Sequence, residues 1–219
     1  MKSYFCGMDK PVLILGAKGI AKAAMEIFLS HNVAVYGFLD DDESLHGSDI
    51  NHIPILGQTE DDGYLKLIGK KCEAFVAVED PQLRKGLVKL LNERRKVMPT
   101  NAIHSNAIIA DSAHLGYGNF INAGATVGAE AKVPNHCILH SSAVIEHEVI
   151  LGDFVQIGAG SVINSGVEIA EGAFIGSGVT IVSGVKIGKK ARIGAGSVVI
   201  ADVKAGETVF GNPAVAVKS

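Results

Sequence analysis

Tryptophan is absent from this sequence and cysteine is scarce, with only Cys6, Cys72 and Cys137 among 219 residues. An odd number of widely spaced cysteines without a CxxC pair argues against a disulfide framework and a structural zinc site, and is typical of a reducing compartment. Apolar runs long enough to cross a bilayer are also missing, and the first ten residues contain no apolar segment of the kind that a secretory signal needs. We therefore expect a cytoplasmic protein without a membrane span.

A surplus of charge of one sign is missing too. The 20 lysine and arginine residues nearly balance the 23 aspartate and glutamate residues, and neither sign forms a long run. Such a chain is not suited to coat nucleic acid or an anionic membrane, so we expect neither partner. Glycine, in contrast, is abundant at 26 residues, which suits a fold with many tight corners.

From about residue 103 onward, an aliphatic residue recurs at every sixth position. A second, mostly small series lies four places later, from Ala107 to Val203. A helix needs an apolar spacing near 3.6 and a flat strand a spacing of about 2, so a spacing of six requires a corner after every short strand. The seventeen aliphatic members, uninterrupted by any insertion, are Ile103, Ile109, Leu115, Ile121, Val127, Val133, Leu139, Ile145, Leu151, Ile157, Ile163, Ile169, Ile175, Ile181, Ile187, Ile193 and Val199.

Three such hexads close one triangular turn of 18 residues, with the aliphatic side chains inside and successive turns paired in parallel. The repeat therefore predicts a parallel β-helix. Its left hand departs from the usual right-handed crossover and is taken from the family resemblance given below.

The first hundred residues have a different pattern. A buried strand is expected at residues 11–15, followed by the turn Gly16-Ala-Lys-Gly19, an alanine-rich helix to about Ser30 and a second strand at residues 33–39. A further strand at residues 73–78 and a helix at about 81–95 complete the pattern. We predict a small Rossmann-like α/β domain in residues 1–100 and the β-helix, with a C-terminal tail, in residues 101–219.

The turn after the first strand can hold a phosphate, because glycines allow close backbone approach and the helix that follows presents free N–H groups. The third glycine of a dinucleotide fingerprint is missing, since Lys22 stands in its place, which disfavours NAD. Asp40 ends the second strand, where a ribose ligand would lie. The alternative is a plain tight turn beside a solvated acidic cluster.

In the repeat region, the hexad that departs most from the pattern runs from Ile145 to Ile150. It places His147 between Glu146 and Glu148. A histidine flanked by carboxylates suits a general base that accepts a proton from an attacking amine or hydroxyl. The alternative is a surface corner residue with acidic neighbours.

Three hexads begin Ile157-Gly-Ala-Gly160, Ile175-Gly-Ser-Gly178 and Ile193-Gly-Ala-Gly196, at a spacing of 18, so they stack on one edge of the prism. Side chains are small or absent there, which leaves a groove for a narrow ligand such as a pantetheine arm, unless the glycines merely serve the corners. His147 falls on a different edge. The two features can then meet only between subunits, which predicts a homotrimer.

Metal binding is not expected. His136, His140 and His147 do not recur at positions suited to a tetrahedral site.

Four segments resemble one family, the bacterial UDP-4-amino-sugar N-acetyltransferases, whose near relatives are the sialic acid O-acetyltransferases. The segments are the Gly16–Gly19 turn, Phe38–Asp41, Ser141–Glu148 and Val209–Ala214. The chain differs from the usual family pattern at Gly19-Ile20-Ala21 in place of Gly-His-Gly, at Gln156 in place of a histidine, and at His140 in place of an asparagine.

The resemblance implies that His147 is the base and that Glu148 supports it. It also implies acetyl-CoA as the acyl donor, bound between adjacent β-helices. The residues implied to hold the UDP-sugar are Gly19, Ile20, Ala21, Lys22, Asp40 and Asp41, and those implied to contact CoA are Gln156, Ser177 and Ala195.

We therefore expect an acetyl-CoA-dependent N-acetyltransferase that acts directly on the amino group of a UDP-linked amino-sugar. One alternative is an O-acetyltransferase that acts on sialic acid or another sugar hydroxyl. The other is a β-helix protein that binds sugar nucleotides without catalysis.

Overall fold

The computed structural model describes residues 10–217, so residues 1–9, including Cys6, and residues 218–219 lie outside this description. The chain divides into two compact units, one ending at Ser105 and the other beginning at Asn106. Within residues 10–217, no helix is both long and apolar enough to span a membrane.

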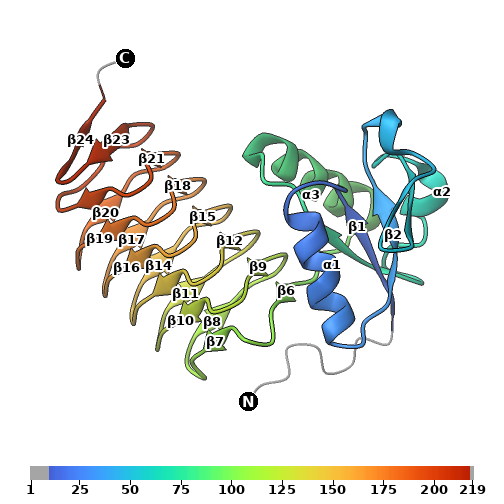
Figure 1. The fold of residues 1–219 in the computed structure, drawn as a ribbon, viewed down its shortest axis with the longest axis horizontal. Coiled ribbons are helices and arrows are strands. Elements are labelled where there is room, and N and C mark those ends of the chain that lie inside the picture. The colour runs from blue at the N-terminus through green and yellow to red at the C-terminus, as the bar shows by residue number, and fades with distance from the viewer. Residues whose placement is uncertain (1–9, 218–219) are drawn as a thin grey trace. The chain divides into compact units, whose positions relative to one another are not determined.

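The first unit is a small Rossmann-like α/β domain, as expected from the sequence (Figure 1). Its sheet has the strand order β3-β4-β2-β1-β5, in which only β3 is antiparallel to its neighbour. The strands are β1 (Val12–Leu15), β2 (Val35–Leu39), β3 (Asp49–Ile50), β4 (Ile53–Gly57) and β5 (Glu73–Val76). The helices are α1 (Ile20–Ser30), η1 (Glu43–Leu45), α2 (Asp62–Leu65) and α3 (Pro81–Arg95), and β6 (Ala102–Ile103) is the unit's last element.

Local sequence accounts for the main elements of this unit. All four residues of β1 are fully buried, and α1 buries an apolar face on which Phe28 meets Phe75 edge-on, with ring centroids 5.7 Å apart. At the start of α3, the Asp80 carboxylate accepts hydrogen bonds from the N–H groups of Gln82 and Leu83, and Pro81 occupies the first turn. These capping signals explain why the bounds of α3 were predictable.

The second unit is the left-handed parallel β-helix, built from two-residue strands in three sheets (Figure 1). We name each sheet after one member. The β13 sheet contains β7 (Ile108–Ile109), β10 (Thr126–Val127), β13 (Val144–Ile145), β16 (Val162–Ile163), β19 (Thr180–Ile181) and β22 (Val198–Val199). The β14 sheet contains β8 (His114–Leu115), β11 (Lys132–Val133), β14 (Ile150–Leu151), β17 (Glu168–Ile169) and β20 (Lys186–Ile187). The β15 sheet contains β9 (Phe120–Ile121), β12 (Ile138–Leu139), β15 (Gln156–Ile157), β18 (Phe174–Ile175), β21 (Arg192–Ile193) and the hairpin β23 (Thr208–Gly211) and β24 (Ala214–Ala216).

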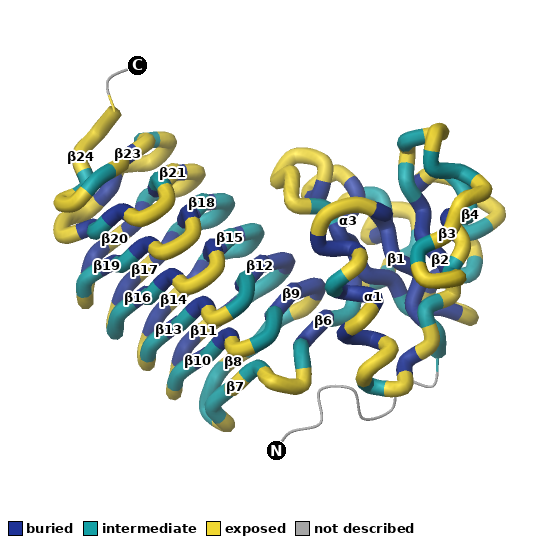
Figure 2. Tube along the Cα trace, in the orientation of Figure 1, coloured by how far each residue is buried: buried dark blue, intermediate teal, exposed yellow. Residues whose placement is uncertain are grey.

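The core of the β-helix follows the 18-residue register. Val127, Ile145 and Ile163 pair in one line of the β13 sheet, and the corresponding aliphatic residues line the other two sheets. Nearly all are buried, and Figure 2 shows the exposed corners between the strands. Asn119 is a polar member of the small series, and its side chain donates to the Pro134 carbonyl and accepts from the Cys137 N–H. Its burial is therefore compensated by hydrogen bonds.

The corners repeat one backbone conformation, with a residue in the left-handed region at every sixth position from Gly118 to Gly196. Most of these residues are glycines. The non-glycine exceptions in this series are Glu130, His136, Ser142, Glu148, Phe154 and Lys190, with φ between 57° and 63°. Each costs about 1–2 kcal/mol relative to glycine, and five of the six occupy consecutive corners between residues 130 and 154.

Candidate active site

The turn after β1 is shaped for close backbone contact. Gly16 has φ 105°, and a Cβ on it would stand 2.7 Å from the Ala77 carbonyl oxygen. Gly19 has φ 54° and is the N-cap of α1, with no side chain capping the helix. The turn and the first N–H groups of α1 therefore lie at the carboxyl edge of the sheet, where ligands of such folds bind.

The acidic residues after β2 are hydrogen-bonded rather than standing free, and Asp40 holds the turn after β1 in place. The Asp40 carboxylate accepts from the N–H of Ala17 at 2.7 Å and from that of Asp42 at 2.9 Å. The Asp41 carboxylate accepts from both the N–H and the hydroxyl of Thr59, each at 2.8 Å. Thr59 was not singled out in the sequence, because only the folded chain brings it beside Asp41.

Not every residue of the expected nucleotide-sugar site can present a side chain. Gly19 and Lys22 are exposed, but Ile20 is only 6% exposed and Ala21 is fully buried in the core. Ile20 can therefore offer a ligand only its backbone groups, and the Ala21 N–H already donates to the Lys18 carbonyl at 3.0 Å.

Lys18 and Asp42 form an ion pair at 2.5 Å across the same turn. The hydrogen bond from the Lys18 ammonium lowers the pKa of the Asp42 carboxyl from 3.8 to about 2. A lowered pKa means that the pair supports the folded turn above about pH 3.8 and that this support is lost as the pH falls through about 2.

We expect Lys18→Met to move the titration midpoint of Asp42 upward, measured by carbon-detected NMR titration of the carboxyl group. An unmoved midpoint would show that Lys18 does not cause the shift.

His147 stands at the corner between the β13 sheet and the β14 sheet. Its side chain is 57% exposed, and its Nδ1 lies 3.7 Å from Oε2 of Glu148. That separation is within ion-pair range but beyond a hydrogen bond. The backbone carbonyl of His147 accepts from the Gly166 N–H, and the Glu148 N–H donates to the Ala129 carbonyl, so neighbouring turns fix the corner on both sides. An exposed imidazole beside a carboxylate is thus fixed by its backbone and free to reach a proton outside the coil.

Glu148 occupies a strained corner position, which makes its role testable. We expect Glu148→Gly to raise the free energy of unfolding by up to about 1 kcal/mol, because the relieved backbone strain exceeds the entropic cost of glycine. We also expect it to lower turnover about tenfold, because the carboxylate beside the base is lost. Thermal melts and initial rates give the two readouts.

Glu130 provides the matched control for this prediction. It lies one turn below Glu148 and has φ 59°, against 60° for Glu148. Glu130→Gly should give the same stabilisation with unchanged turnover. Equal losses of turnover in both variants would mean that the shape of the corner, not the Glu148 carboxylate, supports activity.

The glycine-lined edge lies between the β15 sheet and the β13 sheet. Ala159, Ser177 and Ala195 are exposed there. The glycine after each has φ between 67° and 71°, with no heavy atom within 4 Å of where a Cβ would stand. This edge is therefore open to a ligand as well as suited to the corner conformation, and we call it the open edge.

Gly158 and Gly176, the first glycines of two of these hexads, are required for a different, structural reason. A Cβ on Gly158 would stand 2.4 Å from the Ser177 nitrogen, and one on Gly176 would stand 2.6 Å from the Ala195 nitrogen. These glycines let successive turns stack. The glycines of these hexads thus meet two structural needs, close stacking of turns at the first position and the left-handed corner at the second.

Gln156 lies on the outer face of β15, next to this edge. Its side-chain nitrogen is 3.1 Å from Nε2 of His140. The His140 ring in turn meets Phe120 edge-on, with centroids 6.3 Å apart. From the sequence we discounted His140 as a metal ligand and did not place it beside this edge. Its position 18 residues before Gly158 is nevertheless visible in the sequence.

A basic cluster is absent from the open edge in the part of the chain described. Lys186 pairs with Glu168 at 3.0 Å on the β14 sheet, and Lys189 pairs with Glu171 at 2.7 Å. Arg192 lies on the β15 sheet, where its guanidinium carbon is 4.8 Å from the centre of the Phe174 ring.

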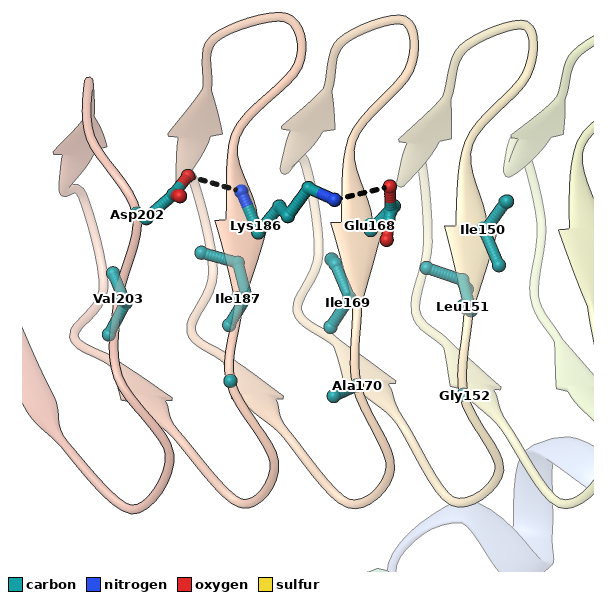
Figure 3. A pocket seen from close by; sticks show the side chains of 11 residues that line it. Ile150, Leu151, Gly152, Glu168, Ile169, Ala170, Lys186, Ile187, Asp202 and Val203 are labelled. Atoms are coloured by element: carbon teal, nitrogen blue, oxygen red, sulfur yellow. Dashed lines mark hydrogen bonds and ion pairs between the residues drawn. The ribbon is translucent and has the colours of Figure 1, made fainter.

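The β14 sheet carries a shallow depression of about 470 Å³. Figure 3 shows Lys186 between Asp202, whose carboxylate accepts from the Lys186 N–H, and Glu168. Because these charges are paired with one another, the depression offers no obvious catalytic group. Among residues 10–217 there is also no cluster of histidine, cysteine or acidic residues that could hold a metal ion.

Two family models match this chain. The PglD N-terminal domain model matches residues 11–91, and the bacterial transferase hexapeptide model, which describes six repeats, matches residues 166–201.

Solved structures extend the similarity over nearly the whole chain. PerB from Caulobacter crescentus, in complex with CoA and GDP-perosamine, has a TM-score of 0.87 and 29% identity over 96% of this chain and 98% of its own. Variants of that N-acetyltransferase with one histidine replaced by alanine or asparagine are similar as well. The acetyltransferase domain of PglB from Neisseria gonorrhoeae, in complex with acetyl coenzyme A, has a TM-score of 0.85 and 26% identity over 95% of this chain and 99% of its own. WeeI from Acinetobacter baumannii has a TM-score of 0.83 and 27% identity over 95% and 100%.

These similarities confirm the family that the sequence motifs indicated. The chain is an acetyl-CoA-dependent sugar acetyltransferase in which a PglD-type N-terminal domain precedes a hexapeptide-repeat β-helix.

Proposed function

We propose that this enzyme transfers the acetyl group of acetyl-CoA to the amino group of a nucleotide-linked amino-sugar. The sequence motifs favour a UDP-sugar, whereas the similar PerB structure contains GDP-perosamine. Both acceptors consist of a nucleoside diphosphate joined to an amino-sugar. The acceptor panel described below distinguishes uracil from guanine as the nucleobase.

The acceptor's diphosphate fits the turn between β1 and α1. Uncapped N–H groups at the start of α1 favour an anion. Gly19 and the exposed Lys22 lie at this helix end, and Asp40 holds the turn through its bond to the Ala17 N–H. Ile20 contributes through its backbone, whereas the Ala21 N–H already donates to the Lys18 carbonyl.

The transfer needs no acyl-enzyme. The amine nitrogen attacks the thioester carbonyl carbon, the C–S bond breaks, and CoA leaves as a thiolate that takes up a proton. His147 accepts the proton that the amine loses, and the Glu148 carboxylate stabilises the resulting imidazolium. Backbone N–H groups of the open edge stabilise the oxyanion. Cys72 and Cys137 are both buried, which argues against a covalent route through either thiol.

The active site is completed between subunits of a homotrimer. His147 and the open edge border the same face of the prism, the outer face of the β13 sheet, from its two sides. The outward strand residues of this face are uncharged, namely Ile108, Thr126, Val144, Val162, Thr180 and Val198. The β14 sheet instead carries Lys132, Glu168 and Lys186. Packing the uncharged face of three copies around a threefold axis sets His147 of one subunit against the open edge of the next.

The test is CoA release with acetyl-CoA and a panel of UDP- and GDP-linked amino-sugars. We expect release only with acceptors that carry a free amine, and mass spectrometry should find one added acetyl group on that amine. Release with free sialic acid or another hydroxyl acceptor alone would favour O-acetylation. Tight binding of nucleotide-sugars without release by any acceptor would favour a non-catalytic binding protein.

A further inference from the structure

His140 interrupts a column of glycines on the outer face of the β15 sheet. The residues that follow the inward aliphatic residue of β12, β15, β18 and β21 are His140, Gly158, Gly176 and Gly194, at a spacing of 18. The strands pair in register, so these four positions are in line. A ligand that extends along the open edge toward the N-terminal turns therefore meets no side chain of this column until it reaches His140.

The His140 side chain has defined neighbours. Its Nε2 is 3.1 Å from the Gln156 side-chain nitrogen, which can only donate, so Nε2 accepts this hydrogen bond. Phe120 meets the imidazole edge-on, and Phe120 and Ile138 are nearly fully buried in register with Gln156 on the same sheet. Imidazole and amide together form a half-buried block beside an apolar floor.

This block lies at the level of the reaction. His140 and His147 belong to the same turn of the coil, which contains β12, β13 and β14. In the proposed trimer the threefold axis runs parallel to the coil, so equivalent turns of the three subunits lie at the same height. His147 of the neighbouring subunit therefore faces the open edge level with His140. Arg192 lies three turns further along the same sheet, about 14 Å away at the ~4.8 Å strand spacing. The positively charged Arg192 suits the phosphates of CoA at that end of the groove. The thioester then lies beside His140.

We propose that the His140–Gln156 pair closes the thioester end of the groove and limits the acyl group to acetyl. The inference rests on the proposed function and adds the residues that select the acyl donor. An acetyl group ends before the block, whereas each further methylene has to displace the imidazole or its hydrogen-bonded amide. One methylene at a fitted wall changes recognition by about tenfold or more.

The test measures binding of acetyl-CoA and butyryl-CoA by calorimetry without an acceptor. The parent should bind butyryl-CoA at least about tenfold more weakly than acetyl-CoA. His140→Gly, which extends the glycine column, should remove most of that difference, while affinity for CoA itself stays within about threefold. His140→Gln retains bulk and a polar tip and should keep the parent's preference. Asn122→Ala, one turn further down the same column, is the matched control and should also keep it.

Two outcomes would overturn the proposal. One is a parent that binds both thioesters equally, and the other is an unchanged preference in a folded His140→Gly variant. Neither depends on the sugar acceptor. A parent that discriminates between the thioesters but acetylates no amino-sugar would instead contradict the proposed function and leave the acyl selection standing.

Discussion

Replacing His147 with alanine is expected to lower turnover by about 10²-fold or more, the usual contribution of a positioned general base. The fold should survive, because the side chain is 57% exposed and contributes little to packing. Initial rates of CoA release with the best acceptor, together with a thermal melt, measure both effects.

The matched control for this variant is His114→Ala, because His114 is an exposed histidine on β8 of the β14 sheet. It should retain the parent's activity. Turnover of His147→Ala within about threefold of the parent would remove His147 from the mechanism.

The repeat made the β-helix predictable nearly residue by residue. An uninterrupted aliphatic series sets which side chains point inward and which turns are neighbours, so the pairing of Val127 with Ile145 follows from arithmetic. Ile109 and Leu115 are only half-buried, unlike the members deeper in the coil, although they have the same place in the repeat. Burial depends on neighbouring turns as well as on the residue's own position.

Short elements were harder to predict. The β3–β4 hairpin and α2 in residues 49–65 were not predicted, because strands as short as Asp49–Ile50 and a four-residue helix leave no periodic signal. The expected C-terminal tail instead contains the hairpin β23–β24, which extends the β15 sheet.

The candidate site was predictable as residue types and edges, but not as contacts. The 18-residue spacing places His147 and Ala195 on different edges, and the structure has them at different corners. The bonds of Asp40 to Ala17 and of Asp41 to Thr59 depend on the packing of loops that no local pattern encodes. The sequence therefore could not tell a free acidic cluster from one that supports the turn.

Blocking the open edge is expected to abolish activity as effectively as removing the base. Ala195 is exposed, and the position after it has open space, so Ala195→Trp should fold normally and fill the groove. We expect CoA binding to weaken and turnover to fall by about 10²-fold, because a displaced thioester no longer meets the base. Calorimetry with CoA and initial rates give the readouts.

Ala205→Trp is the control for a bulky substitution at an exposed alanine. A Cβ placed on Gly188 would stand 2.3 Å from the Ala205 nitrogen, so Ala205 stacks above Gly188. Ala205 therefore lies away from the open edge. It should bind CoA like the parent. Normal CoA binding by Ala195→Trp would show that the groove lies elsewhere.

Mixing the two inactive variants tests most directly whether the active site is shared between subunits. In trimers assembled at random from equal amounts of His147→Ala and Ala195→Trp chains, about one quarter of the interfaces pair an intact base with an intact groove. We therefore predict recovery of about a quarter of the parent's activity after the chains are mixed, unfolded and reassembled. No recovery, with mixed trimers demonstrated by mass spectrometry, would contradict the account and place the base and the groove of each active site within one subunit.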